Sequence, residues 1–201
     1  MGLHEITLNL PQSLEASLAK LYRPEGIYKF SVGISYDGGR DESDNAALEG
    51  MGDIAGHFAG SVGVNFQAKD GGWQYGLRYT GSDESGSVLA GQIGYARHIG
   101  DKLVITPSIH AGWADDEHMQ TYFGVNQQQA NNSINNKFDA ESGLKSVGMG
   151  VALDWTVSED WALKSELNYS RLTNDAADSP LVKTQGSPDQ LKTSIALIYS
   201  F

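Results

Sequence analysis

The sequence contains no cysteine and no long run of apolar residues. The absence of cysteine among its 201 residues excludes a disulfide framework and thiolate chemistry. No run approaches the roughly 18 consecutive apolar residues that a transmembrane helix requires. Positive charge is also scarce, because 14 Lys and Arg face 25 Asp and Glu, which gives a formal net charge of -11. This balance argues against nucleic acid as a partner, since phosphate binding needs an excess of basic residues.

Proline is rare and glycine is frequent, which fits a strand-rich chain better than a helical one. The chain has 5 Pro, 24 Gly and 9 Tyr. Its mean hydropathy of -0.34 is ordinary for a soluble protein, but a membrane β-barrel has a weak hydropathy signal because only alternate residues face lipid. Residues 1–6 lack the basic and then apolar stretch of a secretory signal. Such a start fits an exported protein written without its signal, or a cytoplasmic protein.

Apolar residues alternate with small or polar residues along most of the chain from residue 27 onwards. This two-residue period is typical of β-strands, whose successive side chains point to opposite faces. It predicts strands at residues 28–36, 58–66, 73–79, 89–95, 103–113, 147–155, 161–169 and 191–201.

The amino-terminal residues 1–26 have two interpretations. Ile6, Leu8 and Leu10 alternate like a short strand. Residues 13–22 fit a strand through one apolar period and a helix through another, and the Ala, Leu, Glu and Lys there are helix formers. A strand in this segment gives about ten strands in all, and a helix gives about eight.

The carboxyl-terminal segment 191–201 is typical of the closing strand of an outer-membrane β-barrel. It ends on Phe201, two positions after Tyr199, and its length suits a tilted crossing of roughly 9–11 residues. Aromatic residues also lie at the ends of the other predicted apolar faces, as the two interfaces of a bilayer select. The opposite faces carry charges in mid-strand, which we expect to pair inside a lumen: Lys29, Arg78, Asp154, Lys164, Glu166 and Lys192.

Long and short connections alternate between the predicted strands. The connections at 172–189, 114–145, 81–87 and 37–56 are longer, and those at 157–160, 99–102, 69–72 and 23–26 are tight. Outer-membrane barrels have long extracellular loops and short periplasmic turns. We therefore expect one domain over residues 1–201: an all-β, antiparallel, up-and-down transmembrane β-barrel in the outer membrane, with lipid around its outer face.

The predicted loops carry motifs that resemble those of one protein family. Residues 35–42 are Ser-Tyr-Asp-Gly-Gly-Arg-Asp-Glu, and residues 113–125 are Trp-Ala-Asp-Asp-Glu-His-Met-Gln-Thr-Tyr-Phe-Gly-Val. Residues 142–148 are Ser-Gly-Leu-Lys-Ser-Val-Gly, and residues 169–182 are Tyr-Ser-Arg-Leu-Thr-Asn-Asp-Ala-Ala-Asp-Ser-Pro-Leu-Val. In this order, over residues 27–201, they resemble the MltA-interacting protein family, also called MipA/OmpV, of Gram-negative outer-membrane proteins. The family-motif positions are Asp37, Gly38, Gly39, Arg40, Asp41, Trp113, Asp115, Asp116, Tyr122, Phe123, Gly124, Asp175, Asp178, Ser179 and Pro180, and Tyr199 and Phe201 form the terminal signature.

The resemblance implies a non-enzymatic scaffold of the cell envelope with no cofactor. Such a scaffold holds a lytic transglycosylase, which degrades murein, near a penicillin-binding murein synthase. Other family members are described as porin-like or adhesive, so a passive channel or a surface adhesion protein is the alternative. Family members carry a signal and further strands upstream, so by this resemblance the chain is short at its amino terminus.

A hydrolase at the rim of the barrel is a further alternative. Ser108 and His110 share one predicted face, with Asp115, Asp116 and His118 just beyond them. Nucleophilic catalysis needs a hydroxyl, a base and a carboxylate in such proximity. The opposing interpretation is that these polar groups hydrogen-bond one another and fix the loop. Since no complete catalytic motif is present, we expect no enzyme.

The remaining loop features have simple interpretations. Acidic residues on the predicted outer loops offer oxygen ligands for Ca²⁺, but their spacing is not that of an EF-hand, and a solvated acidic surface is expected. Gly38-Gly39 is expected to shape a turn. Residues 126–136, rich in Gln and Asn, are expected to form a mobile loop tip. The acidic residues are Asp37, Asp41, Glu42, Asp44, Glu49, Asp53, Asp83 and Glu84.

Overall fold

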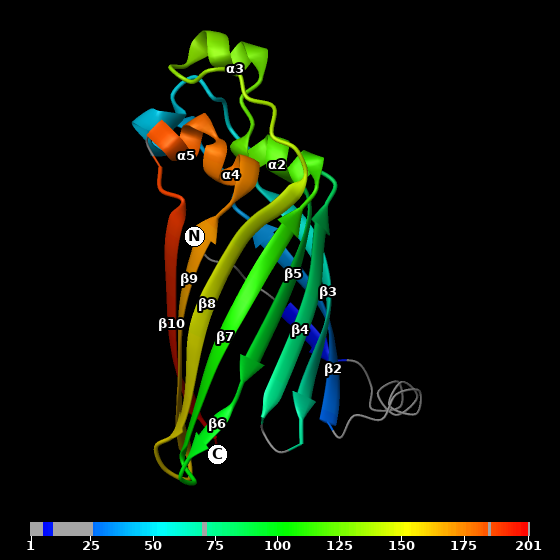
Figure 1. Cartoon of the computed structure of the whole chain (residues 1–201), viewed down its shortest axis with the longest axis vertical. Coiled ribbons are helices and arrows are strands. Elements are labelled where there is room, and N and C mark those ends of the chain that lie inside the picture. The colour runs from blue at the N-terminus through cyan, green and yellow to red at the C-terminus, as the bar shows by residue number, and fades with distance from the viewer. Residues whose placement is uncertain (1–5, 10–25, 70–71, 185, 201) are drawn as a thin grey trace.

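The structure, a computed structural model, describes residues 6–9, 26–69, 72–184 and 186–200. Within them, ten strands form one antiparallel sheet that curls into an open half-barrel (Figure 1). The β-sheet is antiparallel, as predicted, and apart from β5 and β6 each strand pairs with its neighbours in sequence. The strands are β1 (Ile6–Asn9), β2 (Gly26–Asp37), β3 (His57–Ala68), β4 (Trp73–Ser82), β5 (Gly86–Tyr95), β6 (Arg97–Ile99), β7 (Leu103–Ala114), β8 (Gly143–Thr156), β9 (Trp161–Leu172) and β10 (Asp189–Tyr199).

Strands β5 and β6 occupy one position beside β7, and Pro107 lies opposite the break between them. The β5 ladder ends with Gly94 opposite Ser108, and the β6 ladder resumes with Arg97 opposite Ile105, without a change of register. Because proline has no N–H to donate, the ladder loses a hydrogen bond at this point. The described sheet therefore has nine strand positions along its path.

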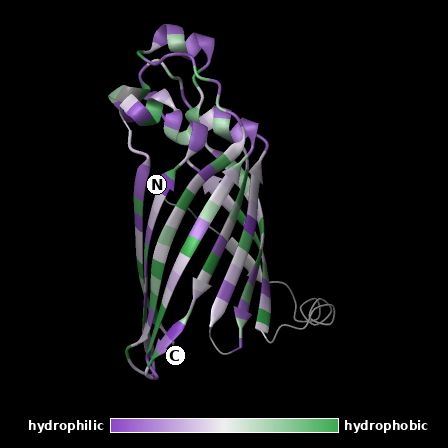
Figure 2. Ribbon diagram, viewed as in Figure 1, coloured by the Kyte–Doolittle hydropathy of each residue, from purple (hydrophilic) through white to green (hydrophobic). Residues whose placement is uncertain are grey.

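Hydrophobic and hydrophilic residues both occur along the strands (Figure 2), and the apolar side chains of the outer face are exposed, as the alternation predicts. Tyr75 stands opposite Ile93, Ile93 opposite Ile109, and Ile109 opposite Met149, so one apolar row crosses four ladder-linked strands. Ile109 and Met149 are each 62% exposed. A face of this kind needs an apolar environment or partner to cover it.

Aromatic rings lie near both ends of the outer face. At one end, the rings of Tyr36 and Phe58 are 5.1 Å apart. At the other end, the ring of Trp161 lies 4.8 Å from that of Tyr199, and Trp73 packs edge-on against Tyr95 at 5.3 Å. The terminal signature is thus described at Tyr199, whereas Phe201 lies outside the described residues.

The inner face places polar side chains over glycines. His110 on β7 stands opposite Gly148 on β8, and Gly150 on β8 stands opposite Asn168 on β9. A Cβ atom at Gly148 would lie 2.3 Å from Nε2 of His110, and one at Gly150 would lie 2.1 Å from Oδ1 of Asn168. The polar groups therefore lie flat across their neighbours, and glycine provides the space that a side chain would fill.

The connections alternate in length as predicted. Those after β3, β6 and β8 are tight, and those after β2, β7 and β9 are long and lie together at the opposite end of the sheet (Figure 1). The connection predicted at 81–87 is shorter than expected, because β4 runs to Ser82 and β5 begins at Gly86. The segment 13–22 and most of the predicted turn 23–26 lie outside the described residues, so the choice between strand and helix there stays a prediction.

The three long connections form a cap over one end of the half-barrel, a term used below for residues 38–56, 115–142 and 173–184. The sequence did not predict its helices, and the segment expected as a mobile loop tip contains one of them. In the described chain, no helix is long and apolar enough to cross a membrane. The helices are η1 (Glu42–Asp44), η2 (Ala46–Leu48), α2 (Asp116–Phe123), α3 (Gln127–Asn132), α4 (Asn174–Asp178) and α5 (Pro180–Thr184).

The buried core lies in the cap and at the strand ends beneath it. Met119 of α2 and Ala176 of α4 are fully buried, and Phe123 packs against their cluster. Burial of the apolar side of α2 stabilises this eight-residue helix, which is too short to persist alone in water. The cap is therefore a packed unit that closes one end of the sheet. The buried cluster comprises Ala114, Met119, Ala140, Leu172, Ala176 and Val182.

Candidate functional site

The first motif follows the end of β2 and includes a glycine with a left-handed backbone conformation. Gly39 has a φ of 75°, a left-handed conformation that glycine adopts without strain. Its N–H donates to Oδ1 of Asp37 at 2.9 Å, and Gly38 lies between them. Arg40 then pairs with Ile54 through two backbone hydrogen bonds of 2.9 and 2.8 Å. These hydrogen bonds close the base of the first long loop, and the turn expected at Gly38-Gly39 stays a prediction.

Acidic side chains of this loop bind backbone N–H groups of the loop itself. Asp41 caps η1 by accepting from the N–H of Ser43 at 2.8 Å, and this bonding holds the pKa of Asp41 below its ordinary value. Asp53 accepts from the N–H of Glu42 at 2.9 Å, and the Glu42 carboxylate accepts from the N–H of Gly52 at 3.0 Å. No group of three His, Cys, Asp or Glu among the described residues is arranged to hold a metal ion, so the Ca²⁺ hypothesis gains no ligand set there.

Asp115 joins the start of α2 to the start of β5, next to the β4–β5 turn. Its carboxylate accepts from the N–H of His118 at 2.9 Å, from the N–H of Ser87 at 2.9 Å, and from the Ser87 hydroxyl. Partial burial raises the pKa of Asp115, but these hydrogen bonds outweigh burial and hold it below its ordinary value. Asp116, the first residue of α2, accepts from the N–H of Ser142 at 2.5 Å. Both carboxylates therefore anchor the helix.

His118 lies where the cap meets strand β8. Its Nδ1 is 3.2 Å from the carbonyl oxygen of Ser85, and its Nε2 is 3.1 Å from Nζ of Lys145. Because a carbonyl only accepts, Nδ1 carries the hydrogen and Nε2 accepts from the ammonium group. Burial, and then the charge of Lys145, lower the pKa of His118 from 6.5 to about 4. At neutral pH, His118 is thus a neutral bridge between the β4–β5 turn and β8.

Tyr122 joins the cap helix α2 to the first loop. Its hydroxyl donates to Oδ2 of Asp37 at 3.0 Å, and its ring lies 4.6 Å from that of His118. Burial, and then the charge of Asp37, raise the pKa of Tyr122. The end of β2, where the first long connection begins, and the second long connection are therefore held together by residues from two predicted motifs.

Ser179 joins the last loop to α2. Its side chain is fully buried, and its hydroxyl donates to the carbonyl oxygen of Phe123 at 2.6 Å. Pro180 begins α5 directly after it. Asp175 accepts from the N–H of Glu141 at 2.8 Å. The structure therefore gathers residues of the motifs at 35–42, 113–125 and 169–182 in and beside one cap, although their separation along the chain gave no sign of these contacts.

Three other motif residues have local roles. Gly124 ends α2 with its N–H donating to the carbonyl of Gln120 at 3.1 Å. Asp178 forms an exposed ion pair with Lys183 at 2.9 Å. Trp113 is 44% exposed on the outer face of β7, near the cap.

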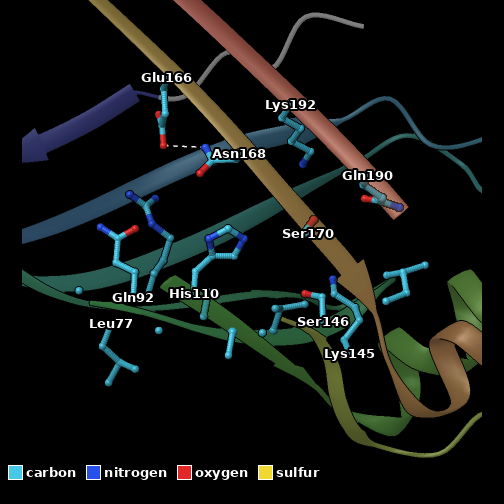
Figure 3. Close-up of a pocket in the computed structure, with 18 of the residues that line it drawn as sticks. Leu77, Gln92, His110, Lys145, Ser146, Glu166, Asn168, Ser170, Gln190 and Lys192 are labelled. Carbon is cyan, nitrogen blue, oxygen red and sulfur yellow. Dashed lines mark hydrogen bonds between the residues drawn. The ribbon is translucent and has the colours of Figure 1, made fainter. Parts of the chain in front are cut away.

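A cavity of about 500 Å³ lies on the inner face of the sheet below the cap (Figure 3). We call it the chamber. Phe123 of the cap and residues from β3 to β5 and β7 to β10 line it. Its polar lining is Asn65, Arg78, Gln92, His110, Lys145, Ser146, Glu166, Asn168, Ser170, Gln190 and Lys192.

A β-bulge directs Lys145 into the chamber. Gly112 stands opposite Ser146, but Trp113 stands opposite Leu144, so Lys145 is an extra residue on β8. Lys145 and Ser146 both line the chamber, whereas regular strand alternation would place one of them outside. Re-aiming a side chain in this way is a common use of a bulge.

Charges pair on the part of the inner face that lies towards the tight turns, as predicted. Lys164 lies 2.9 Å from Asp154, and both line a second cavity of about 350 Å³. At the level of the chamber, Glu166 accepts from Nδ2 of Asn168 at 2.7 Å. Across the described chain, no ion pair with a carboxylate forms at Lys145 or Lys192. Charge pairing is thus confirmed for Lys164 and Asp154 and is not found at Lys192.

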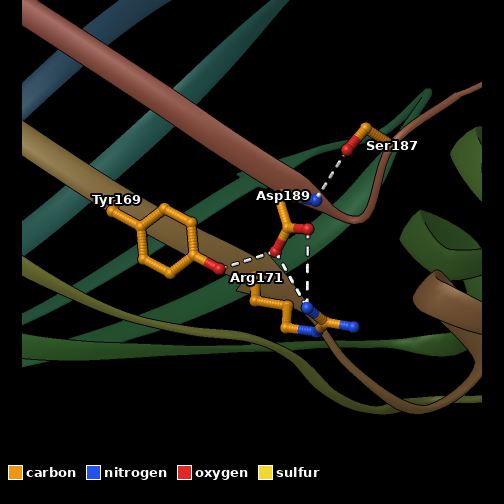
Figure 4. A network of polar contacts seen from close by, with 4 residues as sticks. All are labelled: Tyr169, Arg171, Ser187 and Asp189. Carbon is orange, nitrogen blue, oxygen red and sulfur yellow. Dashed lines mark hydrogen bonds and ion pairs between the residues drawn. The ribbon is translucent and has the colours of Figure 1, made fainter.

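A polar network on strands β9 and β10 fixes the start of the last strand (Figure 4). Tyr169 donates to Oδ1 of Asp189 at 2.6 Å, and Arg171 lies 3.1 Å from the same atom. The N–H of Asp189 donates to the Ser187 hydroxyl at 3.1 Å. The ion pair is exposed, so it sets the position of β10 more than it adds stability.

The geometry supports the interpretation in which the candidate catalytic residues fix a loop. Ser108 and His110 lie on the inner face of β7, but no hydrogen bond joins them in the part of the chain that is described. Asp115 and His118 bind Ser87, Ser85 and Lys145 instead, as given above. The sequence did not indicate Ser85 or Ser87, because their partners lie about thirty residues away and only folding brings them together.

Comparison with known proteins matches nearly the whole chain to one family. The family model described as MltA-interacting protein MipA matches residues 8–201. The MltA-interacting proteins of Escherichia coli (strain K12) and Shigella flexneri are each 22% identical to this chain over 108 residues. That stretch covers 50% of this chain and 40% of each relative, so less than half the length of these curated relatives is matched.

Proposed function

The chain belongs to the MltA-interacting protein MipA family, and on this premise we propose that it is a non-enzymatic outer-membrane β-barrel protein that acts as a cell-envelope scaffold. It holds a lytic transglycosylase near a penicillin-binding murein synthase. The names of two relatives, both MltA-interacting proteins, support the first partner. The second partner rests on the family resemblance given above.

The exposed apolar outer face supports the membrane location and is the observation that carries the proposal. Phe58 is 70% exposed and Leu197 is 61% exposed, on strands from opposite parts of the sheet. Lipid chains would cover such a face, and the rings near its two ends would lie at the two bilayer interfaces. Polar groups gather on the inner face, where a lumen would keep them away from lipid.

The tight turns are the proposed docking end for the murein enzymes. With the cap outside the cell, these turns face the periplasm. The turns after β6 and β8 extend furthest from the cap (Figure 1), and exposed charges surround them, among them Arg97, Asp101 and Glu159. Because little backbone lies beyond the strands at this end, these side chains are the accessible recognition groups.

Capture from envelope extracts tests the scaffold. The wild-type chain, immobilised in detergent, should retain both a lytic transglycosylase and a penicillin-binding murein synthase. Glu159→Lys should reduce capture, because it reverses a charge on the docking end. Asp83→Lys makes the same change on the β4–β5 turn at the cap end and should leave capture intact. No enrichment of either enzyme by the wild-type chain would refute the scaffold proposal.

Folding into lipid tests the membrane location separately. The chain should insert into phospholipid vesicles and, in detergent, migrate differently on gels before and after heating. A chain that folds and stays monomeric in detergent-free buffer would contradict the location. In that case something other than lipid would have to cover its exposed apolar face.

A passive channel is the second candidate, and the two polar cavities on the inner face favour it. Single-channel conductance in planar bilayers separates the two functions. Steady conductance by the wild-type chain would support the channel, whereas a closed barrel that captures the murein enzymes would support the scaffold alone.

A further inference from the structure

The chamber carries positive charge in an acidic protein. The chain as a whole has a formal net charge of -11. Among the described residues, the chamber lining nevertheless contains two lysines, Lys145 and Lys192, and one carboxylate, that of Glu166. The lower cavity differs, since its Lys164 is matched by Asp154 at 2.9 Å. Within the described residues, the two lysines of the chamber therefore lack the carboxylate partner that Lys164 has in the lower cavity.

Lys145 points inward, although no carboxylate among the described residues pairs with its ammonium group. The bulge in β8 directs it inward, and its ammonium group contacts Nε2 of His118 at 3.1 Å. His118 accepts this hydrogen bond as a neutral ring and supplies no negative charge. Removing an ammonium group from water without a counter-charge is costly, so a bound anion would stabilise this arrangement.

The remaining lining suits hydroxyl groups. Gln92, Asn168 and Gln190 present amides that both donate and accept, and Ser146 and Ser170 present hydroxyls. Figure 3 labels all five among the residues that line the chamber, together with Lys145 and Lys192. The volume of about 500 Å³ falls within the roughly 300–1,000 Å³ of small-molecule sites. An apolar ligand would leave these polar groups unpaired, at a cost for each.

The geometry points to the chamber as a binding site for a small sugar acid, a monosaccharide that carries a carboxylate. The carboxylate binds the ammonium groups of Lys145 and Lys192, and the sugar hydroxyls exchange hydrogen bonds with the amides of the walls. Charge-assisted hydrogen bonds of this kind are the stronger ones in proteins. The site lies on the inner face, away from the tight turns, so it does not depend on capture of murein enzymes.

Titration calorimetry on the folded chain in detergent, at low ionic strength, tests the site. Sodium glucuronate is the probe, with glucose as the neutral sugar and sodium acetate as the carboxylate without a sugar. Glucuronate should bind at least about tenfold more tightly than either, because it alone satisfies both the cations and the amides. Equal binding of glucose, equal binding of acetate, or no binding of glucuronate would overturn the assignment.

Three variants connect binding to the proposed residues. Lys145→Gln and Lys192→Gln should each weaken glucuronate binding about tenfold, and Lys192→Arg should retain most of it. Lys183→Gln removes a cation from the cap surface, where it pairs with Asp178, and should bind as the wild type does. Lys192 is exposed on the last strand, so its variants fold even if Lys145→Gln loosens the cap. Wild-type affinity in Lys192→Gln would contradict the site.

Discussion

Acidification should loosen the cap through one residue, His118. The folded residue binds a proton only near its lowered pKa of about 4, whereas the unfolded residue binds one near 6.5. Between these values the open or unfolded state carries more protons, so the stability of the cap falls as the pH decreases from 6.5 to about 4. The stabilisation is complete above pH 6.5. Asp115 acts in a different pH range. The folded state favours its ionised carboxylate, so its contribution to stability is lost only as the pH falls below the ordinary carboxylate range.

The magnitude follows from the same shift. A change from 6.5 to about 4 corresponds to roughly 3 kcal/mol at 1.36 kcal/mol per pKa unit. His118 is only partly buried, so solvent screening reduces the effect to about 1–2 kcal/mol. The groups that face it have opposing effects, since Lys145 opposes protonation while Asp115 and Asp37 favour it. The cap-opening equilibrium should therefore rise about 5–30-fold across the window.

Hydrogen exchange in α2 measures this opening. Peptides covering residues 116–123 should lose protection as the pH falls from 6.5 to about 4, after correction for the intrinsic pH dependence of exchange. His118→Asn, which cannot titrate, should abolish the loss within this window. His98→Asn removes an exposed histidine on β6 and should behave as the wild type does. Equal loss of protection in wild type and His118→Asn would refute the reasoning.

Three substitutions test the cap and the inner face by denaturant unfolding. Met119→Ala should destabilise the cap by about 2–5 kcal/mol, because it leaves a cavity in a fully buried cluster. Asp115→Ala should cost about 2 kcal/mol through loss of the α2 cap and the Ser87 bonds. Gly148→Ala should cost about 1–3 kcal/mol, because the new Cβ would lie 2.4 Å from the carbonyl oxygen of Tyr169.

Each of these substitutions has a matched control. Ile134→Ala truncates an apolar cap residue that is 78% exposed, and it should change stability little. Asp83→Ala removes a carboxylate from the turn that Asp115 anchors, and this carboxylate accepts no hydrogen bond among the described residues. Gly143→Ala adds a Cβ with nothing within 4 Å. If a control variant lost as much stability as its test variant, the stabilising role assigned to the test residue would be wrong.

The sheet was predictable because its cause is local. Alternation along each strand and the lengths of the connections located β2 to β5 and β7 to β10 but not the three-residue strand β6. Short-range patterns of this kind are what a sequence indicates best. The sequence also contains the cause of the break opposite Pro107, since proline lacks the N–H that a ladder needs. The bulge at Lys145 was not, because it depends on how Trp113 and Leu144 pair across two strands.

The cap was missed for two different reasons. Helix α2 had readable signals: Asp115 before it, acidic residues in its first turn and Gly124 after it. Helices α4 and α5 have five residues each, too few for a periodic pattern. The cap is held by contacts such as Tyr122 with Asp37, which are 85 residues apart. Such contacts come from tertiary packing, which propensity alone does not anticipate.

The order of strands in the sheet has a kinetic consequence. Apart from the ladder between β5 and β7, which passes over the short β6, every ladder among the described residues joins strands that follow one another in the chain. The sheet can therefore form hairpin by hairpin with small loop-closure entropies. The bonds of the cap span longer loops, 56 residues between Ser179 and Phe123 and 85 between Tyr122 and Asp37. The cap should therefore form late, after the folding transition state. Substitutions in it should accelerate unfolding and leave the refolding rate nearly unchanged.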